Sequence, residues 1–241
     1  MNTLSTTPAF SVQRSSDRAT FDHGWLKTFH SFSFAQYHDP RNVNWGALRV
    51  FNDDYIGAGE GFPTHPHRDM EIVTYVLDGE LAHEDSMGNE GVVGPGGVQF
   101  MSAGTGVRHS EFNNRADKLL HLVQMWILPG KLGQPPAYGQ MEFTIDERRN
   151  RWLDIVSGRH DVSAPIRITQ DATFSVARIE DMELVREFSP KRFGFIFVAD
   201  GTLEVNGETL HKGDAVRSFD VSRISAKGHG ELTVWDLPAI S

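Results

Sequence analysis

Two short strings constrain what this chain can fold into more than any other feature: His65-Pro66-His67 and His109-Ser110-Glu111. Each string places two metal-binding side chains at positions i and i+2. On a β-strand such residues point to the same face, roughly 6.6 Å apart. Two such strands lying side by side would supply three imidazoles and one carboxylate to a single ion. The strings lie 44 residues apart, so the fold has to bring them together.

Composition narrows both the chemistry and the class of protein. The chain contains no cysteine, which excludes disulfides and cysteine-ligated zinc and leaves histidine, aspartate and glutamate as metal ligands. A formal charge of −9 and the absence of a dense basic cluster argue against direct nucleic-acid binding. There is no apolar run of about 18 residues, so no membrane span is expected. The polar N-terminus lacks the apolar segment of a secretory signal, which favours a cytoplasmic protein.

The pattern of short apolar runs and turn residues predicts an all-β fold. Glycine is frequent, with 23 residues, and helical periodicity is scarce. Expected strands are residues 47–52, 71–77, 79–85, 97–102, 119–128, 167–169, 173–179, 182–188, 194–199, 202–205 and 232–236. Residues 143–154 form a candidate short helix. Asn206-Gly207 and Asp200-Gly201 are expected to form hairpin turns, and Asp53-Asp54 is interpreted as a turn as well.

The two halves of the chain resemble each other, which indicates an internal duplication. Gly79-Glu80-Leu81 is similar to Gly201-Thr202-Leu203, and each opens a strand after an apolar run. The proline- and glycine-rich segment 129–136 reads as a connector. We therefore expect a flexible tail over residues 1–20, a metal-binding domain over 21–135, and a second domain over 136–241. The second half has no His-x-His string, so this domain is predicted to lack a metal site.

Longer motifs resemble those of a known family. Residues 59–67, Gly-Glu-Gly-Phe-Pro-Thr-His-Pro-His, resemble the first cupin motif, and Pro95-x-Gly97 resembles the start of the second. The string from Met101 to Glu111, in which the histidine comes late, resembles the pirin family. So do Asp22-His23-Gly24-Trp25-Leu26 and residues 83–88, His-Glu-Asp-Ser-Met-Gly. The resemblance covers most of residues 22–130 and continues more weakly to the end of the chain.

The pirin resemblance implies a bicupin, in which two β-barrel (jelly-roll) domains are stacked and joined by a short linker. Only the N-terminal domain of such a protein keeps a metal. Carried over residue by residue, the implied ligands are His65, His67, His109 and Glu111. Glu71 stands where ordinary cupins place their ligand glutamate, so either Glu71 or Glu111 can supply the carboxylate. The pirin-type motif favours Glu111, and Glu71 is then expected in the substrate pocket.

The resemblance also implies an activity. Bacterial pirins of this type are similar to quercetin 2,3-dioxygenases, which open a flavonol ring with O2 and release carbon monoxide. Other pirins bind transcription factors, so a metal or redox sensor with a regulatory protein partner is the alternative. A further cupin chemistry on a small metabolite, such as isomerisation, stays open. The sequence is compatible with a monomer.

The expected site has a defined chemistry. One divalent metal, Fe(II) by preference and otherwise Zn, Cu, Mn, Co or Ni, would bind the substrate hydroxyl as its anion. Glu111 is the candidate catalytic base that accepts the hydroxyl proton. Candidate pocket residues for a flat aromatic substrate are Phe62, Met70, Glu71 and Phe100, and Phe29, Phe32 and Phe34 are further aromatic candidates. His83 and His121 are expected to be hydrogen-bonded residues inside or at the rim of the barrel.

Overall fold

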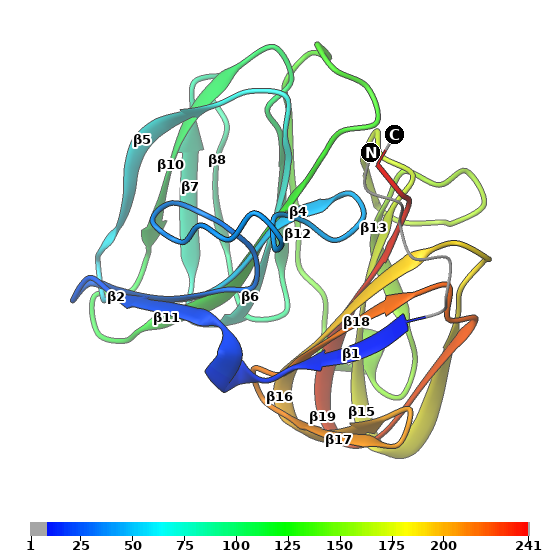
Figure 1. Ribbon diagram of the computed structural model, residues 1–241. Coiled ribbons are helices and arrows are strands. Elements are labelled where there is room, and N and C mark those ends of the chain that lie inside the picture. Colours follow the sequence, from blue (N-terminus) through cyan, green and yellow to red (C-terminus); the bar gives the residue numbers. More distant parts are fainter. Residues whose placement is uncertain (1–8, 241) are drawn as a thin grey trace. The chain divides into compact units, whose positions relative to one another are not determined.

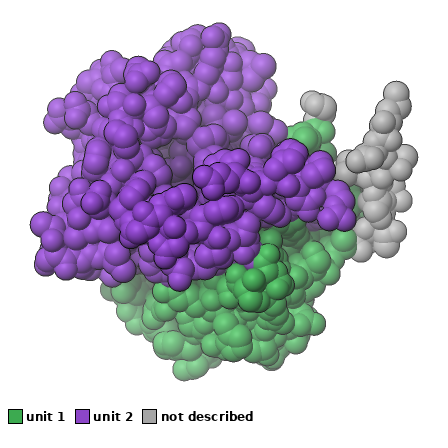
Figure 2. Space-filling view, turned by 60° about the vertical axis from the view of Figure 1, so that its left-hand side comes forward, with its two compact units in different colours: residues 1–17, 145–167, 171–241 green, residues 18–144, 168–170 purple. Residues whose placement is uncertain are grey.

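The computed structural model describes residues 9–240 and consists almost entirely of β-strands. The chain divides into two compact units, coloured in Figure 2. Unit 2 comprises residues 18–144 and 168–170, and unit 1 comprises residues 1–17, 145–167 and 171–241. Each unit is built from β-sheets, so the predicted all-β fold with two domains is confirmed. No helix within residues 9–240 is both long and apolar enough to span a membrane.

Unit 2 is built from two antiparallel sheets (Figure 1). The larger sheet has the order β12 (Ala137–Met141), β9 (Val98–Ser102), β6 (Glu71–Asp78), β11 (Leu120–Ile127), β4 (Leu48–Ile56), β3 (Leu26–His30) and β2 (Ala19–Asp22). The smaller sheet has the order β5 (Gly61–His67), β10 (Val107–Asn113), β7 (Leu81–Asp85) and β8 (Glu90–Val93). An aliphatic cluster that includes Leu26, Ile56 and Leu122 is buried in this unit.

Unit 1 contains one sheet of eight strands. Its order is β1 (Ala9–Gln13), β18 (Ala215–Phe219), β16 (Phe193–Val205), β19 (Arg223–Leu237), β15 (Thr173–Glu187), β13 (Leu153–Ser157) and β14 (Ile166–Arg167), with β17 (Glu208–His211) paired to β16. The described residues also form a 3-10 helix, Ser15–Asp17, and one short α-helix, α1 (Ile145–Arg148). The apolar core of this unit is formed mainly by residues of β15, β16 and β19, with Leu210 of β17 and Val216 of β18.

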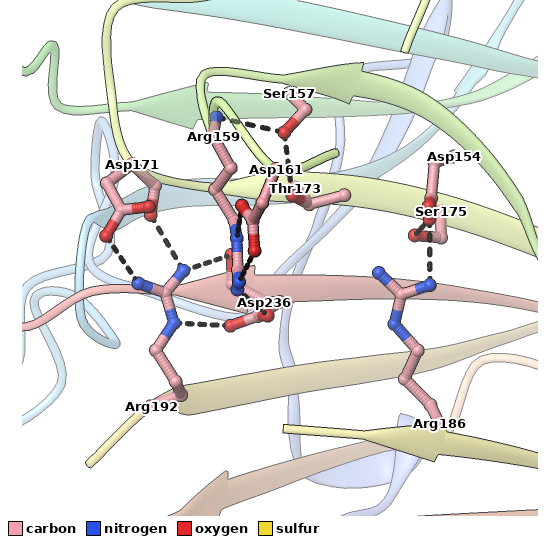
Figure 3. A network of polar contacts seen from close by, with 10 residues as sticks. All are labelled: Asp154, Ser157, Arg159, Asp161, Asp171, Thr173, Ser175, Arg186, Arg192 and Asp236. Atoms are coloured by element: carbon pink, nitrogen blue, oxygen red, sulfur yellow. Dashed lines mark hydrogen bonds and ion pairs between the residues drawn. The ribbon is translucent and has the colours of Figure 1, made fainter. Parts of the chain in front are cut away.

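Unit 1 also holds a network of charged side chains, of which Arg192 and Asp236 are buried (Figure 3). The Arg192 guanidinium lies between Asp171, at 2.7 Å, and Asp236, at 2.6 Å. Arg159 reaches the second carboxylate oxygen of Asp236 at 2.8 Å and also pairs with Asp161. Because every carboxylate in this cluster has a guanidinium partner, the network satisfies the charges that the fold buries.

The domain boundaries differ from the expected ones. Residues 9–17 are not part of a flexible tail, because β1 pairs with β18 and Ser15–Asp17 is helical. Residues 136–144 belong to unit 2 instead of the second domain, because β12 pairs with β9. Residues 168–170 also belong to unit 2. Residues 1–8 of the predicted tail lie outside the described residues.

Strand lengths in unit 1 also differ from the prediction. The expected strands 173–179 and 182–188 form one long strand, β15, and 194–199 and 202–205 form β16. The predicted turn at Asp200-Gly201 is therefore wrong; this dipeptide lies within β16, beside a register shift between Val198 and Asp200. The predicted turn at Asn206-Gly207 is correct, since both residues have positive φ between β16 and β17.

Candidate metal centre and pocket

Three histidines meet where β5 and β10 lie side by side in the smaller sheet of unit 2. His65 and His67 come from β5, and His109 lies opposite His65 on β10. The ligand atoms of these three side chains all lie within 4.8 Å of one another. Among the described residues, they form the only such group of three metal-binding side chains. The alternation of a β-strand explains the arrangement, because His65 and His67 share one face.

A bulge in β5 brings the side chain of Phe62 to the same face as the histidines. Between the pairs His109–His65 and Glu111–Phe62, β10 has one residue and β5 has two, Pro63 and Thr64. Proline has no N–H to donate to a sheet ladder, and a bulge is one of the few places where a strand accepts it. The extra residue shifts the alternation, so Phe62 lies on the pocket side with His65, and their ring centroids are 6.4 Å apart.

The hydrogen bonding of His65 and the burial of His67 and His109 favour metal binding. Nδ1 of His65 lies 2.9 Å from the Pro63 carbonyl oxygen. Since a carbonyl only accepts, Nδ1 donates and the lone pair is left on Nε2. Burial, together with the neighbouring imidazoles, lowers the pKa of His67 and of His109 to about 3. Both ring nitrogens of the buried His109 lack a protein partner. Three imidazoles that converge in this way fit a divalent transition metal.

Glu111 lies next to this cluster but outside the group of three. Its Oε1 accepts a hydrogen bond from Nε2 of Gln99 at 2.9 Å, and its Oε2 accepts one from Nε2 of Gln124 at 2.8 Å. Oε1 of Gln124 in turn accepts the indole N–H of Trp126 at 3.1 Å. Burial raises the pKa of the Glu111 carboxyl, and the Gln124 amide opposes this shift. The two amides fix the orientation of the carboxylate.

A pocket of about 320 Å³ opens beside the histidines. Both sheets of unit 2 contribute to its wall. The lining residues are Phe34, Asn52, Asp54, Phe62, Pro63, Thr64, His65, His67, Glu111, Gln124 and Trp126. Phe34 contacts Trp126 edge-on, and Trp126 contacts His67 in the same way at 4.8 Å between ring centroids. This volume is near the lower end of the range for small-molecule sites.

Only one of the four expected pocket residues lines this pocket. Phe62 does, whereas Glu71 and Phe100 are buried in the opposite layer of the sheet. Glu71 pairs in register with Ile127, and Phe100 pairs with Val73, so both point away from the face that carries Gln124 and Trp126. The prediction for these two residues is wrong, because each lies on the face of its strand that is turned away from the pocket. Met70 packs instead against the apolar cluster of Ile72, Met101, Ala103 and Val107.

Glu71 has a different position and different partners. Its side chain is fully buried, and Oε1 accepts hydrogen bonds from the backbone N–H of Thr169 at 2.6 Å and from the Thr169 hydroxyl at 3.0 Å. Oε2 accepts the backbone N–H of Gln170 at 3.3 Å. Of the two candidate carboxylates, Glu111 lines the pocket and Glu71 attaches residues 168–170 to unit 2.

Several pocket residues were missed by sequence reasoning. Gln124 and Trp126 fall on one face of the expected strand 119–128, together with the apolar Leu120 and Leu122. The interpretation of Asp53-Asp54 as a turn is wrong, because both aspartates are buried within β4, and it hides the pocket residues Asn52 and Asp54. The signal that was available is the i, i+2 spacing of polar residues in an otherwise apolar strand.

The other candidate histidines lie close to the pocket or behind it. His121 faces the layer behind the pocket, where its Nε2 lies 2.7 Å from Asp53 and its ring stacks on Tyr55. The remaining Asp53 oxygen pairs with Arg18 at 2.8 Å. His83 is buried with its ring stacked on Tyr138 and its centroid 5.3 Å from that of His109.

Comparison with known proteins agrees with the resemblance found in the sequence. Residues 11–127 match the family model described as Pirin, and residues 160–234 match the model described as Quercetinase C-terminal cupin domain. The quercetin 2,3-dioxygenase of Escherichia coli K12 is 40% identical, with 95% of this chain and 99% of the relative covered. A pirin-like protein of Caulobacter vibrioides is 42% identical, with 89% and 94% covered.

Solved structures agree as well. The bacterial pirin YhhW of Escherichia coli, determined in complex with nickel(II), is 37% identical and superposes with a TM-score of 0.89. The comparison covers 96% of this chain and all of the other.

Proposed function

Because this chain belongs to the pirin family, we propose that it is a metal-dependent dioxygenase of the quercetin 2,3-dioxygenase type. The proposed reaction opens the flavonol ring of a quercetin-like substrate with O2 and releases carbon monoxide. Unit 2 is the proposed catalytic unit. The proposal is supported by the relatives of that name, whose sequences align along nearly their whole length with this one.

One observation carries the proposal: three imidazoles converge beside a pocket whose wall includes three aromatic side chains. Their donor set suits a divalent metal, and we propose Fe(II), with Glu111 as the fourth ligand. When bound, such a metal lowers the pKa of a coordinated hydroxyl, so the substrate becomes an electron-rich anion. Phe34, Phe62 and Trp126 supply flat surfaces against which an aromatic substrate can pack.

Glu111 is the proposed base for the substrate hydroxyl. Its carboxylate lines the pocket, and each oxygen accepts one amide hydrogen bond. A carboxylate oxygen has two lone pairs, so each still has one lone pair with which to take a proton or contact a metal. Gln99 and Gln124 hold the group in place while the proton moves.

Oxygen uptake with quercetin tests the proposal directly. The protein would be loaded with Fe(II) and compared with His67→Ala, which removes one of the three imidazoles. His160→Ala is the matched control, because His160 is exposed and lies in unit 1. We expect uptake that requires the metal, is lost in His67→Ala and is unchanged in His160→Ala.

The same assay can overturn the proposal. Metal binding without oxygen uptake across Fe, Mn, Co, Ni and Cu would exclude a flavonol dioxygenase. The role of Glu111 is tested by Glu111→Gln, which should lower turnover more than it lowers flavonol binding. Equal losses in turnover and in binding would remove Glu111 from the base role.

A further inference from the structure

One part of the pocket wall is polar and lies on the sheet opposite the histidines. Asn52 and Asp54 both line the pocket, although each side chain belongs to a residue that is only 4% exposed. They stand two residues apart on β4 and therefore point to the same face, roughly 6.6 Å apart. The histidines come from β5 and β10 of the other sheet, so the pocket has a metal-binding side and a polar side.

Both polar side chains have an atom without a protein partner. Oδ1 of Asn52 and Oδ1 of Asp54 are buried and make no hydrogen bond within the protein. A buried polar atom without a partner costs about 1–3 kcal/mol, so such atoms are rare unless they serve a ligand or water. Two of them on one strand face, both lining a pocket, indicate a hydrogen-bonding subsite.

The chemistry of the pair restricts what it can bind. Burial raises the pKa of the Asp54 carboxyl to about 7, so near neutral pH this group is able to donate a hydrogen bond as well as accept one. The carbonyl oxygen of Asn52 only accepts. A ligand oxygen between them satisfies both side chains only if it accepts from one and donates to the other, and a hydroxyl has both capacities. A methoxy oxygen, which has no proton to donate, leaves the Asn52 oxygen without a partner.

We propose that Asn52 and Asp54 form a subsite that binds a ring hydroxyl of the substrate remote from the hydroxyl held at the histidines. This inference rests on the proposed flavonol substrate and extends it. The pair orients the ligand and selects hydroxylated flavonols over those that lack a hydroxyl or carry a methoxy group at that position. Asn52 and Asp54 are positioning residues, since the reacting atoms lie at the other side of the pocket.

Substrate discrimination tests the subsite. Wild-type protein, Asp54→Leu and Asn52→Leu would be assayed with quercetin and with 3-hydroxyflavone, which lacks the remote hydroxyls. Thr74→Val is the matched control, because Thr74 is buried in the same sheet, has a side-chain oxygen without a partner and does not line the pocket. Losing one hydrogen bond changes affinity by about tenfold. We expect each leucine variant to lose about tenfold of the preference for quercetin, through KM and with kcat little changed.

The outcomes separate this inference from the proposed function. Flavonol binding would also be measured on metal-free protein by ligand absorbance, and melting curves would confirm that each variant folds. If Asp54→Leu does not fold, Asn52→Leu carries the test alone, because it removes the oxygen to which the ligand hydroxyl donates. Turnover by the wild type with an unchanged quercetin preference in the variants would overturn the subsite alone. Failure of the wild type to bind or turn over either flavonol would overturn the proposed function.

Discussion

Side chains that face the pocket alternate along β4 and β11 with side chains that pack into the layer behind it. Asn52 and Asp54 face the pocket, whereas Asp53, between them, pairs with Arg18 and His121 on the opposite side. Adjacent aspartates therefore have different environments and different acidities. The hydrogen bond with His121 and the charge of Arg18 hold the pKa of Asp53 below its usual range against the effect of burial, and burial raises the pKa of Asp54 to about 7.

Asp54 makes the stability of the protein depend on pH in a specific direction. Its folded-state pKa lies above its unfolded value, so the stabilisation from the bound proton is complete below about pH 4 and is lost as the pH rises towards 7. Asp54→Asn cannot titrate. The difference in the free energy of unfolding, variant minus wild type, is therefore expected to be roughly 2–3 kcal/mol larger at pH 8 than at pH 5. Urea titrations of metal-free protein at both pH values measure this difference.

The control for this experiment is Thr74→Val, whose difference from wild type should not vary with pH. A difference between Asp54→Asn and wild type that stays constant from pH 5 to pH 8 would contradict the raised pKa.

The sequence predicted the three histidines better than their surroundings. His65, His67 and His109 belong to short motifs, and the i, i+2 rule alone places two of them on one face. The partners of Glu111 were not predictable in this way. Gln99 stands beside the expected Phe100, and a single step of the strand alternation decides which of the two reaches the carboxylate. A motif is enough to predict the three histidines, whereas the neighbouring groups depend on strand register.

At the scale of elements, the pairing of β5 with β10 determines the geometry of the centre. The two strands approach closely at Gly61. A Cβ atom placed there would lie 2.2 Å from the Glu111 carbonyl oxygen and 2.5 Å from Cα of Phe112. Both neighbouring atoms belong to the backbone, so neither can move without shifting β10. Glycine at position 61 is therefore required by the close approach of the strand that carries His109 and Glu111.

Gly61→Ala should consequently damage the metal centre. We expect a loss of about 1–3 kcal/mol in the free energy of unfolding, because the added methyl group forces the two strands apart. Affinity for the metal should fall as well, since His65 and His109 lie on these strands. Gly139→Ala is the matched control, because Gly139 also lies in a strand of unit 2 and has no atom within 4 Å of the added Cβ. Calorimetric metal titration and thermal melting measure both effects, and equal behaviour of the two variants would refute the argument.

At the scale of the whole molecule, neither unit is a continuous piece of chain. Residues 9–17, from the N-terminal end, belong to unit 1, and residues 168–170, from the C-terminal half, belong to unit 2. The all-β character and the duplication were predictable because glycine-punctuated apolar runs repeat along the chain. The assignment of residues 9–17 to unit 1 and of residues 168–170 to unit 2 was not predictable. It depends on pairings such as that of Ala9 with Phe219, which lie far apart in the sequence and share no local pattern.

Removal of β1 should affect the two units differently. Deletion of residues 1–13 takes away a strand at the edge of the unit 1 sheet, together with the half-buried Phe10 and Val12, which pack against the aliphatic core. We expect unit 1 to lose roughly 2–3 kcal/mol of stability. Metal affinity should not change, because every residue of unit 2 is retained. A deletion that ends at residue 8 and leaves β1 in place is the control.

Calorimetry and metal titration give the two readouts. A loss of metal affinity in the longer deletion, or no loss of stability, would show that β1 does not act only on unit 1.

The contact between Glu71 and residues 168–170 has a consequence for how the chain is made. A ribosome releases the chain from the N-terminus, so all the proposed metal ligands are synthesised long before Thr169. The partners of Glu71 are therefore synthesised only after more than 50 further residues have followed Glu111. The pairing of β1 forms later still, because its partner β18 is among the last strands to be synthesised. Such distant pairings slow folding, and the finished units are expected only near the completion of synthesis.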